Sequence, residues 1–220
     1  FEHEIGEHSI RILNADLVII SPGISDRIPI INDCRENNIP IVSEIEFASW
    51  FTHSPILALT GSNGKTTTIN LLHEMCVSDG RNSLLGGNVG IAFSENVLWE
   101  LSSNISNPVH VLEVSSFQLE HTVSFSPLIA GILNISEDHM DRYKDIDDYT
   151  RNKLKIAVNI QDIGWLVYNA DDHILSKFLQ DRSRTIIFSM EQRMQCHYKL
   201  NATKIYSGKD ENPEVLFKLE

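Results

Sequence analysis

The strongest constraint on the fold of this chain is a glycine-rich segment that separates an apolar run from a helical segment. The run Ile56–Leu59 predicts a buried strand, and residues 65–78 predict a helix. Between them stands the sequence TGSNGKTT, Thr60–Thr67. Glycines let the backbone fold closely around an anion, and the first turn of a helix presents unpaired N–H groups to it. This order of strand, turn and helix predicts a phosphate-binding loop.

We expect the loop to surround the phosphates of a nucleotide with Gly61, Ser62, Asn63, Gly64, Lys65, Thr66 and Thr67. Lys65 would reach the outer phosphates, and the Thr66 hydroxyl would bind Mg²⁺. The general GxxxxGK[ST] pattern asks for glycine where Leu59 stands. The alternative is a glycine-rich turn that binds no ligand.

Composition limits the class of protein. The chain has 220 residues, 42% of them hydrophobic and 22% charged, as in an ordinary globular protein. A formal net charge of −12 argues against nucleic-acid binding, which needs a basic surface. The three cysteines form no CxxC pair, and neither a membrane-length apolar run nor a signal-peptide pattern is present. We therefore expect a cytoplasmic protein that contacts neither nucleic acid nor membrane.

The rest of the chain alternates between apolar runs and helical segments. A short strand–helix–strand step is expected within Asp16–Ser43, with the turn Ser21-Pro22-Gly23 after its first strand. Further strands are expected at Val109–Val114, Leu128–Leu133, Trp165–Tyr168 and Thr185–Phe188, a helix at about residues 146–160, and edge β structure in Tyr198–Glu220. This alternation predicts an α/β fold with a parallel sheet covered on both faces.

Carboxylates stand at the ends of two of these strands, where ligands bind in open α/β sheets. Glu113 is placed to hold Mg²⁺; the alternative is a solvated glutamate. The segment Asn134–Tyr143 (NISEDHMDRY) carries three carboxylates and His139, which form a hard-ligand set suited to Mg²⁺ or Mn²⁺. The alternative there is a polar loop that caps the next helix.

Together these motifs resemble the Mur ligase family. Its version of the phosphate loop resembles Thr60–Thr67, which accounts for the mismatch at Leu59. Within the family, the similarity is strongest to members that join D-glutamate to UDP-N-acetylmuramoyl-L-alanine. The other segments that carry it are Gly86–Gly90 (GGNVG), Glu113–Glu120 (EVSSFQLE), Asn134–Tyr143 and Val167–Asp172 (VYNADD).

The resemblance implies an ATP-dependent amide ligase of peptidoglycan precursor synthesis that works through an acyl phosphate. Its substrates would be UDP-N-acetylmuramoyl-L-alanine and D-glutamate, with ATP and Mg²⁺. The implied catalytic residues are Lys65, His139 and Lys153; the implied metal ligands are Thr66, Glu113, His139 and Lys153; and the implied substrate-binding residues are Gly23, Asn88, Ser115 and Gln118.

Lys153 would serve as a metal ligand after carbamylation, because a carbamate offers oxygen atoms and a protonated amine does not. Lys155 lies two positions further along the same helix, on a different face, so it cannot replace Lys153. The alternative is that Lys153 is an ordinary solvated helix lysine.

The resemblance also implies the domain organisation. Residues 1–45 would be part of a Rossmann-like, UDP-binding N-terminal domain, 46–54 a linker, and 55–220 the central ATP-binding domain, incomplete at its C-terminal end. Such a chain is expected to bind nucleotide weakly and to be inactive alone. The alternatives are a Mur-type ligase for another amino acid, a nucleotide-binding module without ligase activity, and a non-catalytic remnant.

Overall fold

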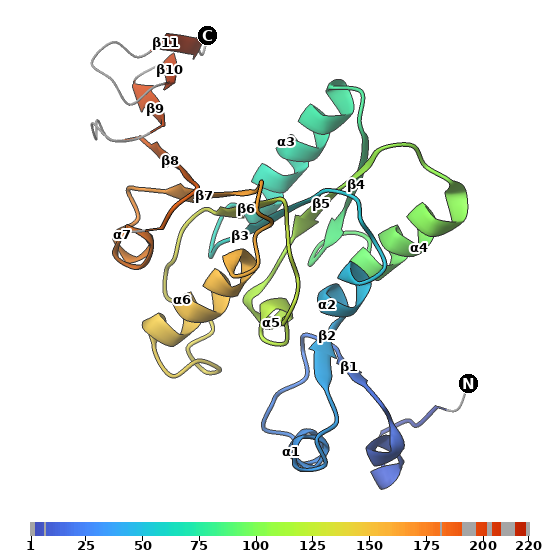
Figure 1. Ribbon diagram of the computed structural model, residues 1–220. Helices are drawn as coiled ribbons and strands as arrows, with labels where there is room; N and C mark the ends of the chain where they lie inside the picture. Colours follow the sequence, from blue (N-terminus) through green and yellow to red (C-terminus); the bar gives the residue numbers. More distant parts are fainter. Residues whose placement is uncertain are drawn as a thin grey trace.

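The computed structural model describes residues 3–6, 8–180, 182–190, 197–201, 204–207 and 214–218. Most of them form or cover one sheet, whose strand order is β11-β10-β9-β8-β7-β6-β3-β5-β4 (Figure 1). Its strands are β3 (Ile56–Thr60), β4 (Asn82–Gly87), β5 (Pro108–Glu113), β6 (Ile129–Ile132), β7 (Trp165–Asn169), β8 (Thr185–Ser189), β9 (Tyr198–Asn201), β10 (Lys204–Ser207) and β11 (Glu214–Lys218). Pairing is parallel from β4 across to β9, and antiparallel among β9, β10 and β11. The predicted parallel α/β sheet and its β-rich edge are confirmed.

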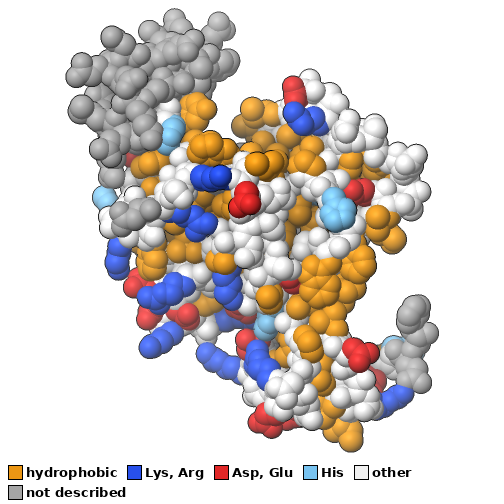
Figure 2. All heavy atoms as spheres, in the orientation of Figure 1, with side chains coloured by type: hydrophobic (Ala, Val, Ile, Leu, Met, Phe, Trp, Pro, Cys, Tyr) orange, Lys and Arg blue, Asp and Glu red, His pale blue; other side chains and the backbone are white. Residues whose placement is uncertain are grey.

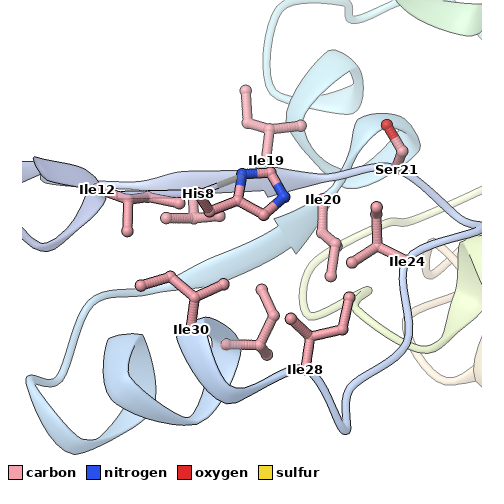
Figure 3. A pocket seen from close by; sticks show the side chains of 10 residues that line it. His8, Ile12, Ile19, Ile20, Ser21, Ile24, Ile28 and Ile30 are labelled. Carbon is pink, nitrogen blue, oxygen red and sulfur yellow. The ribbon is translucent and has the colours of Figure 1, made fainter. Parts of the chain in front are cut away.

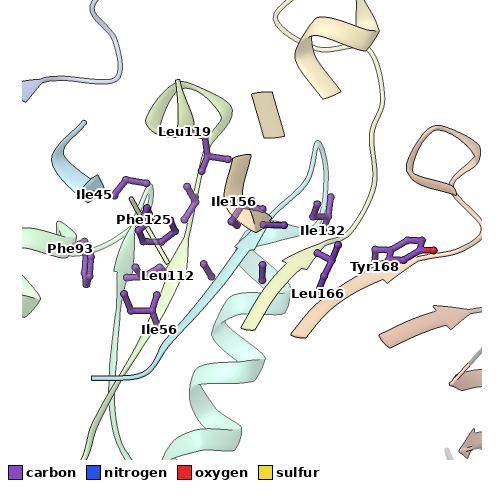
Figure 4. Close-up of a cluster of buried hydrophobic side chains, with 14 of the residues drawn as sticks. Ile45, Ile56, Phe93, Leu112, Leu119, Phe125, Ile132, Ile156, Leu166 and Tyr168 are labelled. Atoms are coloured by element: carbon purple, nitrogen blue, oxygen red, sulfur yellow. The ribbon is translucent and has the colours of Figure 1, made fainter. Parts of the chain in front are cut away.

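Both faces of the sheet are covered because its central strands are apolar on both sides. Alternate residues of a strand point to opposite faces. Ala58 and Leu112 therefore join the larger core, drawn in Figure 4, whereas Leu59 and Val111 pack under one helix on the other face. That helix is α3 (Lys65–Ser78); helices on the larger-core side are α4 (Phe93–Ser103), α5 (Ser116–Leu119), α6 (Ile146–Leu154) and α7 (His173–Leu179).

A smaller unit precedes the sheet and lies below it in Figure 1. It contains the 3₁₀ helix η1 (Ile10–Asn14), β1 (Val18–Ile20), α1 (Pro29–Glu36) and β2 (Ile41–Ser43), and β1 pairs with β2 in parallel. An apolar pocket of about 170 Å³ lies beside β1, lined mainly by isoleucines (Figure 3). The predicted strand–helix–strand step is therefore present.

The junction between the two units contains a helix, α2 (Glu44–Ser49), where the sequence suggested a linker. Ile45 and Ala48 of α2 belong to the larger core. The buried Glu46 carboxylate accepts hydrogen bonds from the backbone N–H groups of Val123 (2.9 Å) and Phe125 (2.8 Å). Much of residues 46–54 is therefore packed structure, and the domain boundaries themselves stay a prediction.

Sequence reasoning missed β4, α4, α5 and α7. The pair Gly86-Gly87 ends β4. The expected helix at 146–160 ends at Leu154 and continues as the 3₁₀ helix η2 (Lys155–Ala157). The strand β4 was missed because it is glycine-rich and half polar, so it lacks the apolar run used to identify the other strands.

The surface mixes charges of both signs. Over α6 and α7, basic side chains stand among acidic ones in Figure 2. Arg151 and Lys177, for example, both pair with Asp147, at 3.9 and 3.6 Å. No helix in the described ranges has the length and apolar character needed to cross a membrane.

Candidate functional site

The carboxyl ends of β3, β5 and β6 lie side by side, because β3 pairs with β5 on one side and β6 on the other. The phosphate loop follows β3, and two of its positions require glycine. Gly61 and Gly64 have φ angles of +151° and +80°, which side-chain-bearing residues rarely adopt. A Cβ on Gly61 would also lie 3.1 Å from the Leu133 Cβ. Backbone geometry therefore explains both glycines.

Residues after β6 hold the loop in shape. Asn134 accepts hydrogen bonds from Ser62 N (2.9 Å, to its backbone oxygen) and Asn63 N (2.8 Å, to Oδ1), and its side-chain amide donates to Asn63 O (3.0 Å). Ser62 Oγ donates to Ser136 O (3.1 Å) and accepts from Ser136 N (2.9 Å). Asn134 and Ser136 therefore hold the backbone of the phosphate loop in place. The sequence prediction gave these two residues no individual role, because the pairing of β3 with β6 that brings them to the loop is not visible in the local sequence.

Two lysines from different helices meet at one carbonyl of the loop. Lys65, the first residue of α3, donates to Gly61 O (2.9 Å) and Ser62 O (3.0 Å). Lys153 of α6 donates to the same Gly61 oxygen at 3.0 Å. Its side chain is buried, and the residue is only 2% exposed, so the alternative of a solvated helix lysine is wrong.

The environment of Lys153 weakens its proton affinity. Burial, together with the nearby Lys65 charge, lowers the pKa of Lys153 to about 7, whereas the Asp138 charge opposes the shift. The Lys153 ammonium position also lies 4.7 Å from the centre of the Tyr149 ring. Near neutral pH this lysine therefore has a large fraction of uncharged, nucleophilic amine.

Thr66, Glu113 and Asn88 form a second group of contacts beside the loop. Thr66 Oγ1 donates to Glu113 Oε2 (2.7 Å), and Asn88 Nδ2 donates to Glu113 Oε1 (2.8 Å). Glu113 is 1% exposed, so the alternative of a solvated glutamate at the strand end is also wrong. A Cβ on Gly87 would lie 2.2 Å from the Glu113 carbonyl oxygen, so the glycine permits β4 to approach β5 here.

Ser115 and Gln118 lie directly after β5 and bond to each other. They form a capping box at the start of α5: Ser115 N donates to Gln118 Oε1 at 3.0 Å, and Gln118 N donates to Ser115 Oγ at 3.3 Å. Both residues follow Glu113 closely in the chain, and in the structure their side chains start helix α5.

His139 lies in the loop after β6 with a left-handed backbone, φ +56°. Its ring packs 4.7 Å from the Phe117 ring, and Nε2 lies 3.4 Å from Asp138 Oδ2. Among the described residues, no three His, Cys, Asp or Glu side chains gather into a metal-binding group. The predicted set of three carboxylates around His139 is therefore not assembled in the described part of the chain. A metal role for His139 stays a prediction.

Gly23 lies in the smaller unit, away from the phosphate loop. Its turn borders the apolar pocket of Figure 3 through Ser21 and Ile24. Arg142, from the loop that carries His139, donates to Ile24 O at 3.0 Å. The structure therefore brings the Gly23 turn beside the His139 loop, although the two are far apart in sequence.

Comparisons with known proteins agree with this geometry. Residues 59–219 match the family model described as Mur ligase middle domain. The chain is 41% identical over 189 residues to the UDP-N-acetylmuramoylalanine–D-glutamate ligase of Christiangramia forsetii, and 38% identical over 217 residues to that of Chloroherpeton thalassium. These matches cover 84% and 91% of this chain but 41% and 46% of the relatives. The chain therefore spans less than half their length.

Solved structures share the fold. A UDP-N-acetylmuramoyl-L-alanyl-D-glutamate–2,6-diaminopimelate ligase superposes with a TM-score of 0.62 at 17% identity, over 90% of this chain and 52% of its own. The MurF ligase from Thermotoga maritima, solved in complex with ADP, superposes with a TM-score of 0.54 at 15% identity, over 89% of this chain and 53% of its own.

Proposed function

Because this chain belongs to the Mur ligase family, we propose that the protein containing it joins D-glutamate to UDP-N-acetylmuramoyl-L-alanine at the expense of ATP, in peptidoglycan precursor synthesis. The relatives that carry this enzyme name support the choice of acceptor. One observation carries the proposal: Lys65 and Lys153 converge on the Gly61 carbonyl, next to the contact between Thr66 and Glu113. The free, buried thiols of Cys34 and Cys76 agree with a reducing, cytoplasmic location.

The loop residues fit a nucleoside triphosphate. Gly64 caps α3 without a side-chain hydrogen bond, so the first N–H groups of the helix have no capping side chain. Anions bind such helix ends because of these donors and the helix dipole. We assign the phosphates of ATP to residues 61–67, and the Lys65 ammonium to the outer phosphates.

The group around Glu113 fits Mg²⁺. A buried carboxylate and a threonine hydroxyl are hard oxygen donors, and Thr66 Oγ1 and Glu113 Oε2 lie 2.7 Å apart. When bound, Mg²⁺ supplies positive charge that neutralises the phosphate oxygens during phosphoryl transfer. Thr66 and Glu113 would hold it, and Asn88 would fix the rotamer of the Glu113 carboxylate.

Lys153 fits the proposed carbamate. Its uncharged amine would attack CO₂, form an N–C bond and release one proton, which leaves a carbamate with two oxygen atoms. The lowered pKa of Lys153 favours this step, because only the unprotonated amine is a nucleophile. Together with His139, the carbamate oxygens would hold a second cation.

The proposed reaction has two steps. A carboxylate oxygen of the muramoyl-alanine attacks the terminal phosphorus of ATP, which gives an acyl phosphate and ADP. The amine of D-glutamate then attacks the acyl carbon, and collapse of the tetrahedral intermediate gives the amide and phosphate. In this scheme Lys65 offsets charge on the transferred group, and Asn88, Ser115, Gln118 and Gly23 contact the muramoyl nucleotide.

The test is phosphate release by the complete protein, with Mg-ATP and UDP-N-acetylmuramoyl-L-alanine, while the amino acid is varied. We expect release with D-glutamate and none with L-glutamate, L-lysine or diaminopimelate. Lys177→Ala is a matched control for lysine variants, because Lys177 is exposed on α7 and its ion pair with Asp147 lies at the surface. Release with another amino acid would reassign the acceptor, and release with none would leave a nucleotide-binding module. We further propose that residues 1–220 alone bind Mg-ATP weakly and catalyse no ligation.

A further inference from the structure

A compact group of side chains joins the His139 loop to the rest of the molecule. The Glu120 carboxylate accepts from Arg142 Nε (2.9 Å), from the other end of the same guanidinium, and from the Tyr143 hydroxyl (2.8 Å). Glu120 ends the segment EVSSFQLE, and Arg142 and Tyr143 end NISEDHMDRY. This two-point pairing fixes the plane of the guanidinium relative to the carboxylate.

Arg142 makes two further contacts, and each points to a predicted functional element. Its guanidinium carbon lies 4.5 Å from the centre of the Phe117 ring, which also packs against the His139 ring, with 4.7 Å between the ring centres. Arg142 Nη2, the same nitrogen that bonds the Glu120 carboxylate, also donates to Ile24 O at 3.0 Å, in the turn that contains Gly23. One side chain therefore touches both the support of His139 and the turn of the smaller unit.

The backbone of His139 depends on the same residues. Its left-handed φ of +56° is a conformation that a non-glycine residue keeps only when its surroundings impose it. The His139 carbonyl accepts hydrogen bonds from Arg142 N (3.0 Å) and Tyr143 N (3.3 Å). Fixing Arg142 and Tyr143 on Glu120 therefore fixes the turn that presents His139.

Contacts with α6 complete the group. Asn152 donates to Tyr143 Oη (3.1 Å) and to Ser116 O (2.6 Å), and Lys155 donates to Glu120 O (2.6 Å). Asn152 and Lys155 flank Lys153, so the group also fixes the part of the helix that carries the proposed carbamate.

We infer that Glu120 and Arg142, with Phe117, form a positioning unit that sets the His139 turn and the Gly23 turn relative to each other. This inference rests on the proposed function. In that function the unit connects the metal-binding side chain with the nucleotide-binding turn of the first substrate. The contacts described for Glu120, Arg142 and Phe117 do not include residues 61–67. Loss of the unit therefore affects binding of metal and of the muramoyl nucleotide while ATP binding stays intact.

The alternative is an ion pair that only stabilises the fold, and a binding profile separates the two. In the complete protein, Arg142→Lys keeps the charge but loses the two-point pairing and the planar stacking. We expect the Mg²⁺ concentration for half-maximal activity, and KM for UDP-N-acetylmuramoyl-L-alanine, to rise about tenfold or more, with KM for ATP within about twofold of wild type. The control Arg151→Lys, an exposed arginine of α6, should change none of these.

Phe117→Leu provides a second variant, should Arg142→Lys fail to fold. We expect it to raise the Mg²⁺ concentration for half-maximal activity more than it raises either KM value. An unchanged Mg²⁺ requirement in folded variants, or an equal rise in KM for ATP, would overturn the inference while leaving the ligase assignment intact. A folded wild-type protein that releases no phosphate with D-glutamate would instead refute the proposed function, and the inference with it.

Discussion

The loops after β3 and β6 both carry predicted site residues, yet they are held in different ways. Gly61–Gly64 takes its shape from two glycines with positive φ and from hydrogen bonds between its backbone and the backbone and side chain of Asn134. The turn at His139 takes its shape from distant side chains, chiefly Glu120 and Phe117. The first loop was readable from its own residues, because glycine positions and helix start are local signals. The second loop needed the tertiary structure.

The largest expected effect comes from removing the charge of the first loop. In the complete protein, Lys65→Ala should lower kcat for phosphate release at least about 100-fold, because one preorganised donor to developing charge contributes that much. Steady-state kinetics with saturating Mg-ATP and D-glutamate measure it, with Lys177→Ala as the control. A kcat within a few-fold of wild type would show that the loop does not act on the transferred phosphoryl group.

The backbone of the first loop can be tested by a pair of glycine variants. Gly61→Ala forces a side chain into a φ of +151° and places its Cβ 3.1 Å from Leu133. We expect a loss of about 1–3 kcal/mol in the free energy of unfolding. Gly23→Ala has no heavy atom within 4 Å of the new Cβ and should change it by less than about 0.5 kcal/mol. Denaturant unfolding compares the two, and equal losses would contradict the local account of the loop.

Lys153 gives a stability effect that depends on pH. The unfolded lysine takes up its proton near its ordinary pKa of 10.5, and the folded one only near pH 7. The unfolded state therefore binds more protons between these values, so this residue makes stability fall as pH drops from about 10.5 to about 7, with no further change below.

Lys153→Met removes this dependence. In CO₂-free buffer we expect the variant to be more stable than wild type at pH 7, on the order of a few kcal/mol, with a smaller gain at pH 9. Thermal or denaturant unfolding at both pH values measures the difference, and Lys177→Met is the matched control. A variant that is less stable at pH 7 would show that Lys153 is held as a favourable buried cation.

The smallest expected effect concerns the connection between the two loops. Asn134→Ala removes the acceptor of Asn63 N and the donor to Asn63 O. We expect a loss of about 1–2 kcal/mol in unfolding free energy and a modest rise in KM for ATP. A Ser136→Ala variant, which keeps its backbone bonds to Ser62, should lose less. Equal losses would show that the side-chain bonds of Asn134 do not shape the loop.

The sequence predicted the parts of the fold whose signals are local. The apolar runs of β3, β5, β6, β7 and β8 and the helix after Gly64 lie where they were expected. The sequence did not predict β4, where glycines and polar residues break the apolar run. It also did not predict α2, because this six-residue helix lies in a short segment that we expected to be a linker. Strand order was also beyond it, because nothing local places β3 between β5 and β6.

The same division applies to the candidate site. Lys65, Thr66 and Glu113 were predicted from motif and strand end, and the structure brings them together. The depth of burial of Lys153 and its meeting with Lys65 at Gly61 O depend on how α6 packs, which the local sequence does not encode. Glu120 and Arg142 sat inside recognised segments but had no assigned role, since their partners are distant in the chain.

The most direct test of the account follows one oxygen atom. UDP-N-acetylmuramoyl-L-alanine labelled with oxygen-18 in its free carboxylate would be turned over by the complete protein with Mg-ATP and D-glutamate. If the carboxylate attacks the phosphorus of ATP, one labelled oxygen leaves with the inorganic phosphate, and mass spectrometry finds it there. Phosphate without the label, formed together with the D-glutamyl product, would contradict the acyl phosphate route. It would require the site around Gly61 to act in another way.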